Sequence, residues 1–124
     1  MNPLYVGIDV GSKSNVAFLM KPDGSKHSCF PVKNSLDGSR QLVKRILLAL
    51  SSESLTDVII GLEATSIYGN SLVYALREDG SLGRFQRKIH VLNPKQVRKF
   101  KDAYPDLPKN DFVDAFVIAD HLRF

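Results

Sequence analysis

The chain has 124 residues, of which 44% are hydrophobic and 24% are charged, and it carries a net charge of +4. This size and composition are typical of one soluble globular domain. The longest apolar runs are far shorter than the ~20 residues that span a bilayer. The single cysteine, Cys29, excludes an internal disulfide and a zinc cluster built on cysteines. The first residues lack the basic and apolar regions of a secretory signal peptide, so we expect a cytoplasmic location and no membrane partner.

Three strands are predicted in the first part of the chain. From Leu4 to Val10 every second residue of "PLYVGIDV" is a large aliphatic one, which is typical of a strand with one apolar face. The segment "KPDGSK" is a strong turn signal between residues 16–20 and 26–32. These two segments are therefore expected to form a hairpin.

A helix, a strand and a second helix are expected next. In "NSLDGSRQLVKRILLALSS" six aliphatic residues, beginning with Leu36, lie near helical spacing, and Asn34 or Ser35 can cap the helix. The short apolar run "TDVIIGLE" suits a buried parallel strand. Residues 67–79 predict a helix that Gly80 ends.

The remaining residues add one strand and two helices. "RKIHVLN" predicts a strand, Pro94 suits the first position of a helix over "PKQVRKFKDA", and residues 109–124 predict a final helix. An antiparallel start followed by strand–helix alternation predicts an α/β fold with a mixed five-stranded sheet flanked by helices. No closing turn follows the final helix, so we expect residues 1–124 to be one domain cut from a longer protein.

Four carboxylates are candidates for a metal site. Asp9 interrupts an apolar strand, where aspartate is disfavoured, and Glu63 ends a buried strand, where sites of open α/β sheets usually lie. Asp111 and Asp114 are neighbours on one helix face. Each has a simpler interpretation, as a strand-end acid or as an acid that complements the helix dipole. Together, four hard oxygen ligands suit Mg²⁺ or Mn²⁺ rather than zinc, and two such ions would serve phosphodiester chemistry.

A basic stretch between residues 84 and 101 is a candidate nucleic-acid surface. It contains seven basic residues and no acid: Arg84, Arg87, Lys88, Lys95, Arg98, Lys99 and Lys101. Such charges can contact a phosphate backbone, and nearby Phe100 and Tyr104 could stack on bases. A solvated face with rings in the core is the alternative interpretation.

Three other residues have structural interpretations. His90 lies inside a predicted strand and is expected to be a structural histidine, whereas His121 ends the last helix and is expected to lie in solvent. Cys29 is expected in the core.

Four segments resemble a known family. They are "YVGIDVGSKSNVAFL", "IIGLEATSIYGNSLVYAL", "VLNPKQVRKFK" and "KNDFVDAFVIADHL". In this order, and with the pattern K-x-D-x-x-D-A, they resemble the N-terminal RuvC-like domain of the DEDD-motif insertion-sequence transposases, also called bridge-RNA-guided recombinases. Ser66 stands where the family often has glycine.

The resemblance implies a ribonuclease H-like (RuvC-like) fold and the catalytic, metal-binding set Asp9, Glu63, Asp111 and Asp114. It also implies DNA and a guide RNA as partners, DNA transposition as the activity, and a homo-oligomer in the full-length protein. In the family a C-terminal domain supplies a serine implicated in strand exchange. That domain is absent from these residues, so we expect little activity from them alone.

Three other classes remain open. A stand-alone Holliday-junction resolvase would share the metal chemistry, and a non-catalytic RNase H-like module would use only the basic stretch. A nucleotide-binding domain of the actin, sugar-kinase and Hsp70 class also resembles "GIDVGSKSNVAFL". It would need two such domains and a second D-x-G hairpin, neither of which the sequence contains.

Overall fold

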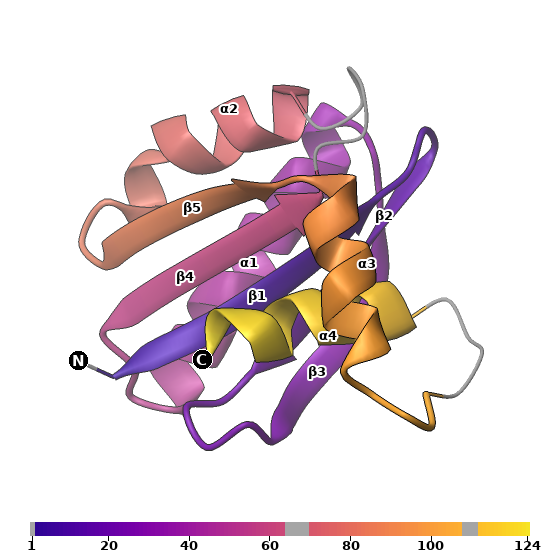
Figure 1. Ribbon diagram of the computed structural model, residues 1–124. Coiled ribbons are helices and arrows are strands. Elements are labelled where there is room, and N and C mark those ends of the chain that lie inside the picture. Colours follow the sequence, from indigo (N-terminus) through magenta and orange to yellow (C-terminus); the bar gives the residue numbers. More distant parts are fainter. Residues whose placement is uncertain (1, 64–69, 108–111) are drawn as a thin grey trace.

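One mixed sheet separates two layers of helices (Figure 1). The computed structural model describes residues 2–63, 70–107 and 112–124. The strands are β1 (Pro3–Val10), β2 (Ser14–Met20), β3 (Lys26–Lys33), β4 (Asp57–Glu63) and β5 (Gln86–Leu92), and their order in the sheet is β3-β2-β1-β4-β5. The predicted mixed five-stranded sheet is confirmed.

The strand directions agree with the sequence patterns. Strands β1, β2 and β3 pair antiparallel, and β4 pairs parallel with β1 and β5. The alternating residues of β1 explain its central position, because one side of the strand holds only large aliphatic residues and all four are buried. The predicted hairpin of β2 and β3 and the predicted parallel strand β4 are both present.

The first helix layer covers the larger core. Helices α1 (Leu36–Ser52) and α2 (Asn70–Glu78) pack against each other and contribute to the cluster that contains the aliphatic face of β1. Of the two predicted caps of α1, Ser35 is the one used, since its hydroxyl accepts a hydrogen bond from Gly38 N at 3.1 Å. Leu36, the first residue of the helix, is 63% exposed, so it does not share the buried face formed by Leu42, Ile46 and Leu50.

A neighbouring arginine donates hydrogen bonds to the end of α2. A short 3₁₀ helix, η2 (Gly80–Leu82), follows α2, so the chain continues to coil at the glycine predicted to stop it. Arg87 on β5 donates from one guanidinium nitrogen, at 2.9 Å, to the carbonyl oxygens of Leu76 and Asp79. It thereby satisfies carbonyls that a helix end leaves without partners. The predicted first turn of the helix, residues 67–69, lies outside the described residues.

The second helix layer consists of α3 (Pro94–Asp102) and α4 (Val113–Leu122). Pro94 opens α3 as predicted, and Asn93 and Gln96 form a capping box before it. Helix α4 lies across β1, β2 and β4, and α3 packs on α4. A smaller core forms here around Tyr5 and Phe18. Cys29, expected in the core, is partly buried and packs against this cluster.

Strand β5 is the edge strand of the sheet next to β4. Its burial pattern alternates, and His90 points to solvent, which corrects the expectation of a structural histidine. Edge strands with one open face tolerate such polar residues because no second layer covers them. In the parts of the chain that the structure describes, no helix is long and apolar enough to cross a membrane.

Candidate metal centre

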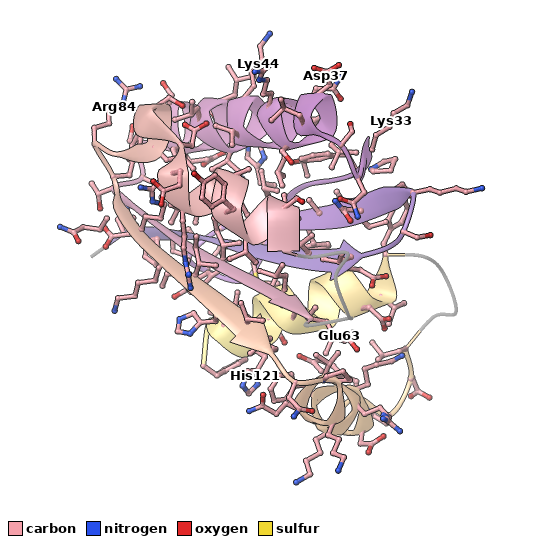
Figure 2. All side chains as sticks on the ribbon, turned by 90° about the horizontal axis from the view of Figure 1, so that it is seen from above. Lys33, Asp37, Lys44, Glu63, Arg84 and His121 are labelled. Carbon is pink, nitrogen blue, oxygen red and sulfur yellow. The ribbon has the colours of Figure 1, made fainter. Side chains whose placement is uncertain are left out.

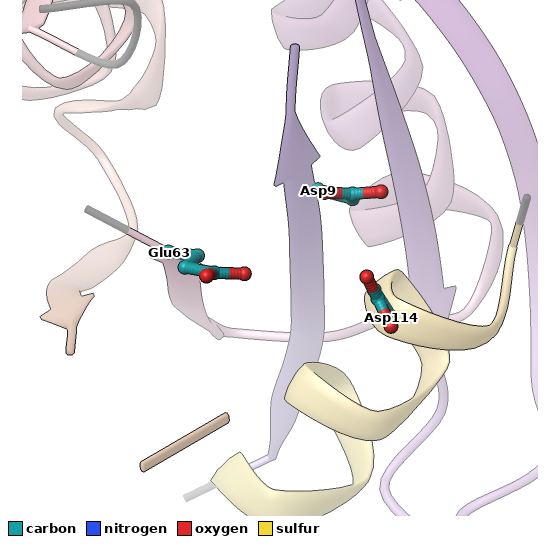
Figure 3. Close-up of side chains that lie close together, drawn as sticks. All are labelled: Asp9, Glu63 and Asp114. Carbon is teal, nitrogen blue, oxygen red and sulfur yellow. The ribbon is translucent and has the colours of Figure 1, made fainter. Parts of the chain in front are cut away.

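Three of the four predicted carboxylates meet at one end of the sheet. Asp9 comes from β1, Glu63 from the end of β4, and Asp114 from the first turn of α4 (Figure 3). One carboxylate oxygen of each lies within 4.8 Å of those of the other two, and all three residues are partly buried. Asp111 lies outside the described residues, so its place in the set stays a prediction.

The pairing of β1 with β4 brings the first two acids together. These strands are parallel, and their last pair in register is Ile8 with Leu62. Asp9 and Glu63 each follow directly, so they stand level at the same ends of adjacent strands. Successive side chains alternate between the faces of a sheet, which places both on the face opposite the large core.

Two glycines bring α4 close enough to add the third acid. Gly7 and Gly61 are paired across β1 and β4, and each lies two residues before an acid. A Cβ atom at Gly7 would lie 2.1 Å from the carbonyl oxygen of Ala115 on α4, and one at Gly61 would lie 3.0 Å from Ile118. The helix therefore rests directly on the strand backbones. The spacings G-x-D and G-x-E were visible in the sequence, but our sequence analysis did not use them.

A lysine shares the centre with the carboxylates. Lys101, near the end of α3, places its Nζ 2.9 Å from Oδ1 of Asp114. The hydrogen bond and the charge of Asp114 raise the pKa of Lys101, and the charges of Asp9 and Glu63 act in the same direction. Lys101 was predicted to belong to a nucleic-acid surface. In the structure it is paired with a candidate metal ligand, because α3 packs on α4, and its contact with nucleic acid stays a prediction.

The electrostatics of Glu63 fit a cation site. Burial raises the pKa of the Glu63 carboxyl, and the negative charge of Asp114 raises it further, while Lys101 and Arg98 oppose the shift. Carboxylates held this close repel one another, and a bound cation would turn that cost into affinity. A donor set made only of carboxylate oxygens suits hard divalent ions such as Mg²⁺ or Mn²⁺.

The other members of the basic stretch divide into two groups. Lys88 on β5 and Lys95, Arg98 and Lys99 on α3 are exposed, and so is Arg84, which lies over the ring of Phe85. Arg87 instead bonds to the end of α2, as described above. Its guanidinium has a structural partner, which makes it the weakest member of the predicted surface.

The aromatic residues near this stretch join α3 to α4. The ring of Phe100 stacks on His121 with centroids 3.3 Å apart, and Tyr104 donates a hydrogen bond to Asp120. Burial and the bond to Asp120 raise the pKa of Tyr104. Phe100 and Tyr104 therefore both have partners on α4 in the structure. His121 is exposed at the helix end as expected, but its ring has this partner (Figure 2).

The arrangement of the sheet and its helices defines a ribonuclease H-like fold. The fold is similar to that of T. thermophilus RuvC in complex with a Holliday junction substrate, with a TM-score of 0.58 and 16% identity over 96% of this chain and 90% of that one. It is also similar to fowlpox virus resolvase in complex with Holliday junction DNA, with a TM-score of 0.51 and 15% identity over 98% and 93% of the two chains.

The sequence places the chain in a particular family within this fold. Residues 6–124 match the family model of the DEDD transposases of the IS110 type, and the chain belongs to this family. No curated protein matches it significantly. The resemblance on which the sequence analysis relied is thereby confirmed.

Proposed function

We propose that the chain is the metal-dependent nuclease domain of a DNA transposase. The observation that carries this proposal is the convergence of Asp9, Glu63 and Asp114, whose oxygens lie within 4.8 Å of one another. Family membership supports the same activity. Asp111, three residues before Asp114, completes the proposed four-acid set.

The proposed cofactor is a pair of Mg²⁺ or Mn²⁺ ions. When bound, such ions lower the pKa of a water molecule and stabilise the leaving oxygen of a phosphodiester. The protein's part is to hold the acids at fixed separations. Strands β1 and β4 fix Asp9 and Glu63 on the sheet, and the close packing of α4 on Gly7 fixes Asp114.

DNA is the proposed substrate. The fold is similar to that of two resolvases whose structures contain Holliday junction DNA. The exposed basic residues of β5 and α3 lie on elements that follow Glu63 along the chain. A guide RNA, a serine-bearing C-terminal domain and a homo-oligomer belong to this proposal through the family resemblance. The cytoplasmic location expected from the sequence is also part of it.

Metal-dependent thermal stability tests the centre directly. Millimolar Mg²⁺ or Mn²⁺ should raise the melting temperature of the wild-type protein, because an ion that binds only the folded state stabilises it. Asp9→Asn and Asp114→Asn should abolish the rise. Asp37→Asn is the matched control, since Asp37 is an exposed acid on α1 on the opposite side of the sheet (Figure 2). A wild-type melting temperature that ignores both ions would remove the basis of the proposal.

A stand-alone Holliday-junction resolvase is the second candidate. It is supported by the similarity of the fold to two resolvases, which extends over 90% and 93% of their chains. The two candidates differ in one assay. A resolvase should cut a four-way DNA junction with Mn²⁺ and no other protein domain, whereas an isolated transposase domain should bind the junction without efficient cutting. Binding that needs no metal, with no cutting in any full-length form, would instead indicate a non-catalytic module.

A further inference from the structure

One cation is already built into the acidic centre. The ammonium of Lys101 lies 2.9 Å from Asp114 and within electrostatic range of Asp9 and Glu63. It comes from α3, which contributes none of the carboxylates. The side chain is 42% exposed and that of Asp114 is 34% exposed, so the contact is accessible to solvent and can open without unfolding.

The position of Lys101 is fixed by contacts on both sides of it. One residue before it, Phe100 stacks on His121, and three residues after it, Tyr104 donates to Asp120. Both partners belong to the end of α4, the helix whose first turn carries Asp114. The backbone of Lys101 is thus held beside α4, whereas its own four-carbon stem is free to rotate.

We propose that Lys101 is a tethered cation that a divalent ion displaces from Asp114, and that the released ammonium then binds a phosphate of the nucleic acid. The inference rests on the proposed function, since it requires a metal at this centre. It adds a coupling that the carboxylate set alone does not contain: metal binding would raise the affinity of the same face for nucleic acid.

Charge balance is the reason for displacement. Without metal, the ammonium neutralises one of the clustered carboxylates. With a divalent ion on Asp114, the ammonium would sit beside a second and stronger cation, and like charges at such distances repel. Bound polyanion offers it a new partner. Because linkage is reciprocal, nucleic acid that holds Lys101 away from Asp114 must also tighten metal binding by the same factor.

Metal affinity of lysine variants is the first test. Mn²⁺ binding is followed through the electron paramagnetic resonance signal of free Mn²⁺ for the wild type, Lys101→Gln, Lys101→Arg and Lys99→Gln. Removal of the competing cation in Lys101→Gln should tighten Mn²⁺ binding about two- to fivefold, the range of energies measured for exposed ion pairs. Lys101→Arg should stay near the wild-type value.

Lys99→Gln is the matched control for net charge. Lys99 is an exposed lysine on the same helix, so its loss changes the general field by the same single charge. It should change Mn²⁺ affinity clearly less than Lys101→Gln does. Equal effects of the two variants, or none from Lys101→Gln, would show that the pair is an ordinary surface contact and would overturn the inference.

Nucleic-acid binding provides the second test. Fluorescence anisotropy with a cleavage-resistant phosphorothioate DNA is measured in Mg²⁺ and in EDTA at constant ionic strength. The ratio of the two affinities should be about two- to fivefold larger for the wild type than for Lys101→Gln, and Lys99→Gln should keep the wild-type ratio. Identical ratios for all three proteins would overturn the coupling.

The two proposals fail in different ways. If the wild-type protein binds no Mn²⁺, both the metal centre and the displacement are wrong. If the wild type binds Mn²⁺ and Asp114→Asn does not, but Lys101→Gln behaves as Lys99→Gln, the metal centre stands and the role of Lys101 is refuted.

Discussion

Within the candidate metal centre, Glu63 and Asp114 differ in what balances their charge. Asp114 has the ammonium of Lys101 at 2.9 Å, whereas the pKa of Glu63 is raised by burial and by Asp114. A simple expectation from clustered acids is that neutralising any of them relieves repulsion. For Asp114 the structure adds an opposing effect, because its removal leaves Lys101 without this partner.

Glu63→Gln should therefore stabilise the metal-free protein at pH 7, by about 0.5 kcal/mol after allowance for solvent screening. The raised pKa of Glu63 means that the folded state disfavours its ionised form. The resulting loss of stability is absent at pH values below the pKa of Glu63 in the unfolded state, and it grows as the pH rises through its pKa in the folded state. Urea unfolding in EDTA at pH 7 and at pH 3.5 measures it. A gain of equal size at both pH values would contradict the charge-based explanation.

At the scale of elements, the packing of α4 on the sheet depends on the glycine pair Gly7 and Gly61. A Cβ at position 7 meets backbone atoms of α4 at 2.1 and 2.5 Å, which cannot move without the helix. For a Cβ at position 61 the three nearest atoms are side-chain carbons of Ile118 and Leu122, at 3.0 Å. The same added methyl group therefore meets rigid helix backbone at position 7 and side chains that can shift at position 61.

We expect Gly7→Ala to lower the free energy of unfolding by about 3 kcal/mol and Gly61→Ala to lower it by about 1 kcal/mol. Gly7→Ala should also weaken the stabilisation by Mn²⁺, because the shift of α4 carries Asp114 away from Asp9. Thermal melts with and without Mn²⁺ measure both effects. If Gly7→Ala kept a wild-type response to Mn²⁺, close helix packing would not be what positions Asp114.

The elements themselves were largely predictable from the sequence. Period-two alternation located β1, and turn and cap residues located the hairpin and α3, because these signals are local. Asp9 and Glu63 were found for the same reason. The pairing of Lys101 with Asp114 was not predictable, because it depends on how α3 packs on α4. The bond from Arg87 to the end of α2 also joins residues that no periodicity connects.

At the scale of the whole molecule, exposed basic residues lie in two groups on different sides of the sheet. The exposed cations Lys88, Lys95 and Lys99 lie on β5 and α3, on the elements next to the metal centre. Lys33 and Lys44 lie on the α1 side (Figure 2). Both groups add to the net charge of +4, but under the proposed function only the first would contact DNA bound at the carboxylates.

Changing Lys88, Lys95 and Lys99 together to glutamine should weaken DNA binding. It should also reduce the slope of log affinity against log salt, by about 0.9 for each phosphate that a removed lysine had neutralised. The double variant of Lys33 and Lys44 is the control and should change the slope little. Anisotropy titrations at several salt concentrations provide the measurement. A control that lowered the slope as much per charge would mean that the protein attracts DNA through net charge alone.

The order in which the acids occur along the chain has a consequence for biosynthesis. Asp9 and Glu63 lie on strands that can pair early, but Asp114 belongs to α4, the last helix in sequence. Contacts between distant parts of a chain form late, because loop-closure entropy opposes them. If the proposed function holds, a nascent polypeptide would therefore have no complete ion-binding cluster until α4 docks on Gly7, and cleavage would begin only after that step.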